Sequence, residues 1–136
     1  MDCSEENNDM IDALFNQSDY VGTKRMLDAT AMRMEAISSN IANLETPGYK
    51  RVDLAPTFTQ TLSRAINAQD SAQIAATKPG IAVDTSAPAS NRDGNTVHME
   101  KELLFLSQNT LAHSLETQLI TRNLNKLRTA INNRPA

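Results

Sequence analysis

The sequence is poor in the residues that build compact aromatic cores and turn-rich folds. Its 136 residues include no tryptophan, two tyrosines and three phenylalanines, so aromatic residues make up 4% of the chain. A core without large rings must be built from Leu, Ile, Met and Ala, which suits packed helices better than a β-sandwich. Four glycines and five prolines are too few for an all-β fold with many turns. The composition therefore predicts a mainly α-helical protein, and the length predicts one domain.

Long hydrophobic runs and paired cysteines are also missing. Residues 103–106 form the longest run of strong hydrophobic residues, far short of the roughly 20 that span a bilayer. The first residues are acidic and no apolar segment follows them, so we expect neither a membrane span nor a secretory signal peptide. Cys3 is the sole cysteine, which excludes a disulfide within the chain.

No arrangement of side chains predicts catalysis or cofactor binding. His98 and His113 are fifteen positions apart on one predicted helix, so one metal ion cannot bind both. The chain has no phosphate-binding glycine loop, no nucleophile elbow and no HExxH motif. Basic residues are spread out and are not interleaved with aromatic residues, which disfavours nucleic-acid binding. We therefore expect a protein that is not an enzyme and that binds no metal, cofactor or nucleic acid.

Glycine and proline divide the chain into three parts. Residues 23–46 and 95–134 contain neither, whereas seven of the nine glycines and prolines lie between them. This pattern predicts a polar segment over 1–18, a helix over 19–46, a turn, short helix and mobile loop over 47–96, and a helix over 97–133. The short helix is expected at 56–67, where apolar residues recur every four positions. Residues 68–95 show no sustained hydrophobic period and are expected to form a loop.

Both long helices carry an apolar stripe with nearly heptad spacing, which predicts that they pack against each other. The stripe of the last helix changes phase between Leu115 and Ile120, like a stutter in a coiled coil. Two helices alone cover only one stripe of each other, so apolar residues would remain for contacts with other subunits. The predicted coiled-coil and assembly residues are Leu27, Met34, Ile37, Ile41, Leu44, Leu104, Leu111, Leu115, Leu124 and Leu127.

The net charge of -3 is small, but opposite charges are concentrated at the two ends of the chain. Six acidic residues and no basic residue lie within residues 1–19, whereas four basic residues and no acidic residue follow Glu116. The two ends are either separate solvated segments or neighbours that complement each other.

The most specific motif covers the end of the first predicted helix and the turn after it. Residues 38–50 read SSNIANLETPGYK, in which Pro47 ends the helix and Gly48 can adopt the positive φ of a type II turn. This string resembles the N-terminal signature of the flagellar axial proteins, the family of rod, hook and hook-associated subunits. The short chain and its C-terminal sequence are similar to the proximal-rod members, which lack large inserted domains. The motif residues are Asn40, Ile41, Ala42, Asn43, Thr46, Pro47, Gly48, Tyr49 and Lys50.

This resemblance implies a single rod-type domain in which the long terminal helices pair as an antiparallel coiled coil. The protein would be a structural subunit of the proximal rod of the bacterial flagellar basal body, the hollow drive shaft on the periplasmic side. It would be exported through the flagellar export apparatus without a cleaved signal peptide. Its partners would be copies of itself, other flagellar rod proteins, the adaptor between the rod and the export gate, and the export apparatus.

A second hypothesis fits the same pair of helices. A cytoplasmic export chaperone or coiled-coil adaptor would also use two long helices and an apolar seam. It would, however, be a stable folded dimer in the cytosol, whereas a rod subunit should be largely monomeric before assembly.

Overall fold

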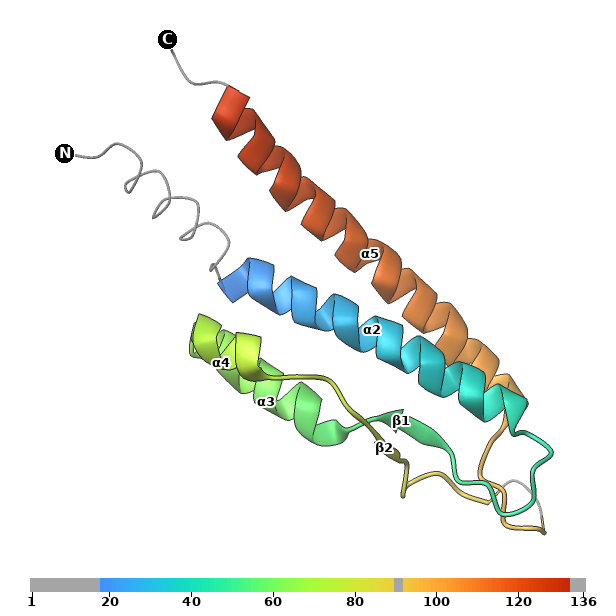
Figure 1. Cartoon of the computed structure of the whole chain (residues 1–136). Coiled ribbons are helices and arrows are strands. Elements are labelled where there is room, and N and C mark those ends of the chain that lie inside the picture. Colours follow the sequence, from blue (N-terminus) through green and yellow to red (C-terminus); the bar gives the residue numbers. More distant parts are fainter. Residues whose placement is uncertain (1–17, 90–91, 133–136) are drawn as a thin grey trace.

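The computed structural model describes residues 18–89 and 92–132. The elements are, in chain order, helix α2 (Ser18–Ala42), strand β1 (Val52–Leu54), helix α3 (Pro56–Asn67), helix α4 (Ser71–Ala76), strand β2 (Ile81–Val83) and helix α5 (Met99–Asn132). The chain is mainly helical, with α2 and α5 as its two long helices (Figure 1). The polar segment predicted at the N-terminus lies, apart from Ser18, outside the described residues.

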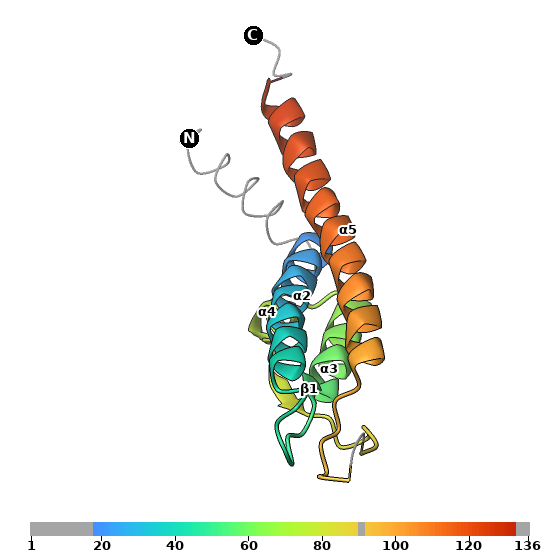
Figure 2. The ribbon, with the colours of Figure 1, turned by 90° about the vertical axis from the view of Figure 1, so that its right-hand side faces the viewer.

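Helix α2 lies between α5 on one side and the α3–α4 pair on the other (Figures 1 and 2). Helices α2 and α5 run in opposite directions. Asn40 near the end of α2 contacts Glu102 near the start of α5, and Thr30, further back in α2, contacts Asn109, further along α5. The two helices are closest at this end and diverge toward the start of α2 (Figure 1). The predicted packing of two long helices is therefore confirmed.

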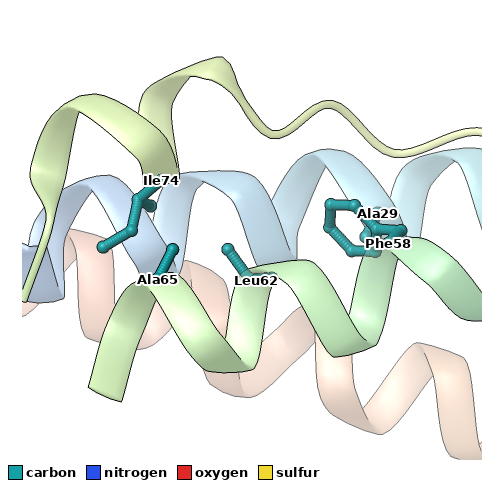
Figure 3. Close-up of a cluster of buried hydrophobic side chains, with 5 residues drawn as sticks. All are labelled: Ala29, Phe58, Leu62, Ala65 and Ile74. Carbon is teal, nitrogen blue, oxygen red and sulfur yellow. The ribbon is translucent and has the colours of Figure 1, made fainter. Parts of the chain in front are cut away.

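A cluster of buried apolar side chains lies between α2, α3 and α4. Figure 3 shows Phe58 of α3 beside Ala29 of α2, Leu62 further along α3, and Ala65 of α3 beside Ile74 of α4. All five side chains are buried. Ala29 presents a small surface, so α3 can lie close to α2 and the core can be filled by a few larger side chains.

The segment of chain between α2 and α5 contains a two-stranded antiparallel sheet. Strand β1 pairs with β2 in the register Val52 with Val83, Asp53 with Ala82 and Leu54 with Ile81. The loop predicted over residues 68–95 is therefore wrong at α4 and at β2. Helix α4 is only six residues long, too short to show a hydrophobic period. Its N-terminus is capped by Asp70, whose carboxylate accepts a hydrogen bond from the Gln73 amide at 3.0 Å. Strand β2 is stabilised by its pairing with β1. This pairing joins residues far apart in the sequence, so a local hydrophobic pattern cannot predict it.

The long helices begin and end at slightly different residues from those predicted. Helix α2 ends at Ala42 and not at residue 46. The Asn43 amide is shared between the carbonyls of Ser39 and Asn40, and the Leu44 amide bonds the Ile41 carbonyl three residues back, which is the tighter 3₁₀ pattern. Helix α5 begins at Met99 and not at residue 97, because Val97 is held in the connection before it. The short helix expected at 56–67 corresponds to α3.

Candidate functional site

The family motif folds the end of α2 back onto strand β1. The Asn40 side chain acts as a strand partner: its Oδ1 accepts the Val52 amide at 2.9 Å and its Nδ2 donates to the Val52 carbonyl at 2.8 Å. The Tyr49 hydroxyl lies 3.1 Å from the Ser39 hydroxyl. Gly48 has a φ of 71°, and the Tyr49 amide donates to the Thr46 carbonyl, which closes the predicted turn.

The remaining motif residues support the same turn. Asn43 Nδ2 donates to the Ser39 carbonyl at 2.9 Å, and Asn43 Oδ1 accepts the Thr46 hydroxyl at 3.2 Å. Lys50 Nζ donates to the Gly94 carbonyl at 2.7 Å. Ile41 is half-buried, whereas Ala42 and Pro47 are exposed. The motif is therefore a hydrogen-bonded corner and offers no enclosed chemical site.

The connection before α5 binds this corner from the other side. Asn95 is completely buried, and its side-chain amide donates to the carbonyls of Asn43 (3.0 Å), Leu44 (2.9 Å) and Thr46 (2.9 Å). Asn95 Oδ1 accepts the Val97 amide at 2.8 Å. The side chain thus satisfies carbonyl groups that α2 leaves unpaired where it ends. This role of Asn95 is not predictable from the sequence, because an Asn after Gly94 indicates only a turn.

A buried ion pair joins the corner to α5. Arg51 Nε donates to Glu102 Oε1 at 2.7 Å, and Asn40 Nδ2 donates to the other oxygen, Oε2, at 3.2 Å. Glu102 has no exposed surface, and the Arg51 side chain is 6% exposed. Two further carboxylates complete the guanidinium's partners: Nη2 donates to Asp53 and Nη1 to Asp84, both at 2.8 Å. We call Asn40, Arg51, Asp53, Asp84 and Glu102 the polar junction.

Electrostatics within the polar junction favour the charged forms. Burial alone would lower the pKa of Arg51, but hydrogen bonds and charge from Asp53 and Glu102 raise it above its ordinary value. Burial alone would raise the pKa of Asp53, but hydrogen bonds from Arg51, the Leu54 amide and Arg33 lower it. Hydrogen bonds from Ser86, followed by Arg51, lower the pKa of Asp84. Every buried polar side-chain atom of the described residues has a hydrogen-bond partner.

Phe105 adds an aromatic contact to the polar junction. The guanidinium carbons of Arg51 and Arg33 lie 4.7 Å and 5.5 Å from the centre of its ring. Both distances are within the range of a cation–π interaction. Phe105 is one turn of α5 beyond Glu102, so the first two turns of α5 hold Arg51 by both charge and ring contact. They contact Arg33 through the ring, while Asp53 supplies its counter-charge.

A second polar contact joins the long helices further along. Asn109 Nδ2 donates to the Thr30 carbonyl at 2.8 Å, and the Thr30 hydroxyl donates to Glu116 Oε2 at 2.8 Å. His113 Nδ1 lies 3.1 Å from the same hydroxyl. Burial raises the pKa of Glu116, and the hydrogen bond from Thr30 only partly opposes that effect. Contact between α2 and α5 thus depends on polar groups at two levels.

In the single chain, most of the predicted coiled-coil and assembly residues of α5 lie away from α2. Leu104, Leu111, Leu115 and Leu124 are 43–64% exposed and do not lie between the two helices of the single chain. The face toward α2 instead carries polar residues seven positions apart, Glu102, Asn109 and Glu116. Leu127 is half-buried. On α2, Ile37 is buried, and Leu27, Met34, Ile41 and Leu44 are half-buried. The buried or half-buried polar heptad of α5 is Glu102, Asn109, Glu116 and Asn123. The role of the leucines as coiled-coil and assembly residues stays a prediction.

Comparisons with known proteins agree with this architecture. The family model described as "Flagella basal body rod protein" matches residues 25–50, which include most of the hydrogen-bonded corner. A flagellar basal body rod protein FlgB from Cereibacter sphaeroides is 34% identical over 107 residues, covering 73% of this chain and 82% of the relative. FlgB from Aeromonas hydrophila is 28% identical over 115 residues, covering 77% and 86%. FlgB from Borrelia hermsii is 30% identical over 113 residues, covering 70% and 82%.

The protein is a structural subunit of the flagellar basal body rod. This class is indicated by the family match at the motif and by the relatives, and the two long opposed helices fit it. The chain belongs to the FlgB family of flagellar basal body rod proteins. The export-chaperone hypothesis is therefore not carried further. Within residues 18–89 and 92–132, none of the helices has the length and apolar character needed to cross a membrane.

Removing the buried charge of Glu102 should destabilise the protein. We expect Glu102→Gln to lower the free energy of unfolding by about 3 kcal/mol, because Arg51 loses a fully buried counter-charge. Glu100→Gln, an exposed change on the same helix, should stay within about 0.5 kcal/mol of the original chain. Urea unfolding followed by circular dichroism measures both; equal stabilities for the two variants would contradict the role of the ion pair.

Acid should weaken the polar junction. The pKa of Asp53 is below its ordinary value of 3.8 in the folded chain, so its contribution to stability is present above about pH 4 and is lost as pH falls toward the folded pKa. We expect the stability difference between the original chain and Asp53→Asn to narrow progressively as the pH falls below about 4. Urea unfolding across this range measures the difference. Glu45→Gln, exposed beyond α2, serves as the control and should differ little at any pH; a constant difference for Asp53→Asn would contradict the assignment.

Proposed function

We propose that the chain is a proximal-rod subunit that self-assembles with other rod proteins through an apolar face of α5. Leu104, Leu111, Leu115 and Leu119 make up this leucine face, and they are 55%, 64%, 53% and 48% exposed. Their spacing of seven, four and four residues places them on one side of a helix. This exposed face is the single observation that carries the proposal, because a contiguous apolar surface of this kind marks a protein contact.

The polar contacts between α2 and α5 support this use of the leucine face. They fix the rotation of α5 about its own axis, since Glu102 and Asn109 must both face α2. The residues of the leucine face lie on a different side of α5, so they point away from α2. Polar residues at seam positions specify register at a cost in stability, as they do in coiled coils. The full antiparallel coiled coil would be completed by helices of neighbouring subunits, which cover the leucine face.

We expect the subunits to assemble head to tail into an open helical array. A leucine face on one subunit would meet a different surface on the next, and such heterologous contacts build an open helical array when the rotation between subunits does not close a ring. Neighbours would be further copies and other rod proteins, and at the base the adaptor to the export gate. The resemblance to axial proteins and the relatives' rod function support these partners and a place in the hollow drive shaft on the periplasmic side.

Export would use the flagellar export apparatus without a cleaved signal peptide. An unfolded chain is easier to pass through a narrow channel when the folded form has a small core. Within residues 18–89 and 92–132, the cluster of buried apolar side chains comprises five residues from three helices. Such a core provides limited stability, so the subunit would gain much of its order from contacts with neighbours in the rod.

A charge on the leucine face should block assembly without unfolding the subunit. We expect Leu111→Asp, introduced at the native gene, to reduce the rods in purified basal bodies at least tenfold, because the carboxylate would be buried without a partner. Thr110→Asp adds the same charge next to it on another side of α5, where the Thr110 hydroxyl bonds only its own helix, and should leave rods intact.

Electron microscopy of purified basal bodies counts the rods, and circular dichroism compares the folded content of the two purified variants. Normal rod numbers in the Leu111→Asp strain would contradict the proposal. Loss of rods in both strains would also contradict it, because the effect would then not depend on the leucine face.

A further inference from the structure

The pairing of β1 with β2 determines which backbone groups point out of the small sheet. The Ala55 amide donates to the Gly80 carbonyl and the Asp84 amide to the Arg51 carbonyl, both at 2.8 Å. In each case the two residues lie directly opposite each other in the β1–β2 register. Opposed pairs that exchange hydrogen bonds alternate with pairs that do not, so every second residue of each strand directs its N–H and C=O groups away from the other strand.

The outer edge of β1 is already occupied. Its outward backbone groups belong to Val52 and Leu54. The side chain of Asn40 in α2 bonds both the N–H and the C=O of Val52, and the Leu54 amide donates to Asp53 Oδ1 at 2.7 Å. Another strand therefore cannot extend the sheet beside β1.

The outer edge of β2 is open. Strand β2 lies on the side of β1 that is away from α2 (Figure 1). Its outward N–H and C=O groups belong to Ile81 and Val83, and no hydrogen bond within residues 18–89 and 92–132 uses them. These two residues are 41% and 53% exposed, and we call them the open edge. Unpaired backbone groups beside exposed apolar side chains form a template for a further strand.

Two copies of the open edge are complementary to each other. When two β2 strands run antiparallel with Ala82 of each at the centre, Ile81 of one copy lies opposite Val83 of the other, and every outward N–H and C=O finds a bond. The exposed apolar side chains also pair across the contact. A shift of the centre by one residue would instead use Pro79, which has no N–H, or Thr85, which lies outside the strand.

The charges at the two ends of β2 favour the same arrangement. Lys78 is exposed shortly before the strand, and Asp84, which follows it directly, is half-buried beside Arg51. Antiparallel pairing brings the start of one strand beside the end of the other. Each Lys78 therefore comes near the acidic end of the strand in the other copy.

We propose that two copies of the chain join through their open edges, so that their two-stranded sheets become one four-stranded antiparallel sheet. Each copy uses the same surface, so a two-fold axis closes the contact and the product is a dimer. Strand β2 has three residues, so the contact is small and the dimer dissociates readily on dilution. The proposal concerns the subunit outside the rod and does not rest on the leucine face or on rod assembly.

A disulfide at the centre of the contact tests the proposal. The two copies of Ala82 would form a non-hydrogen-bonded pair with Cα atoms about 4.5 Å apart, which a disulfide can span. In the full chain with Cys3→Ser, we expect Ala82→Cys to link pairs of chains at least about tenfold faster than the control Thr85→Cys, whose Cα atoms would be about 20 Å apart. Non-reducing gel electrophoresis during oxidation measures both rates. Ala82 is half-buried and Thr85 is exposed, so accessibility alone would favour the control.

Three further changes, each added to Ala82→Cys, show what holds the copies together. Val83→Pro should slow linking to the rate of the control, because it removes an outward N–H and leaves the bonds between β1 and β2 intact. Ile81→Lys should also slow linking, and combining it with Val83→Glu should restore it, since the new charges then lie opposite each other in the two copies. Leu111→Asp should leave the rate unchanged. Circular dichroism compares the folded content of all variants.

Equal linking rates for Ala82→Cys and Thr85→Cys would overturn the proposal. Linking that survives Val83→Pro would overturn it as well, and so would a failure of the lysine–glutamate combination to restore linking. Loss of linking with Leu111→Asp would show that the leucine face joins the copies and would also contradict a contact through β2. Rods in the Leu111→Asp strain are counted separately, so this proposal and the proposed function can fail independently.

Discussion

The ion pair between Arg51 and Glu102 is the interaction on which the arrangement of the long helices depends. Both groups are buried, and each is surrounded by further partners that satisfy its remaining donors or acceptors. An uncompensated charge at this depth would be far more costly than the net gain from the pair itself. The pair therefore acts mainly as a constraint: the corner after α2 and the start of α5 can come together in one relative orientation.

That constraint separates two kinds of surface along α5. The polar heptad that begins at Glu102 faces α2, and the leucine face is left toward solvent in the single chain. An apolar seam between α2 and α5 would have used the same leucines within one subunit and left little for neighbours. A polar seam specifies position at some cost in stability, and it keeps the strongest apolar residues available for assembly. The apolar cluster between α2, α3 and α4 packs the segment between the two long helices against α2, and it contains no residue of α5.

The sequence predicted the helical class, the two long helices and the motif at the end of the first one. These features are local or strongly periodic: Pro47 and Gly48 define the turn, and long segments without Gly or Pro define the helices. The rotation of α5 was not predictable from hydrophobicity, because Glu102 and Asn109 occupy the positions that a seam of leucines would normally fill. Only their spacing of seven residues carried a signal. Asn95 and strand β2 depend on partners more than 25 residues away, which no local pattern reveals.

A double-mutant cycle between Arg51 and Glu102 tests the central claim most directly. Unfolding free energies of the original chain, Arg51→Met, Glu102→Met and the double variant give the coupling energy of the two side chains. If the ion pair fixes the junction, the double variant should recover about 2 kcal/mol or more relative to the sum of the single changes. Additive effects, within about 0.5 kcal/mol, would show that the two residues act independently and would contradict the account.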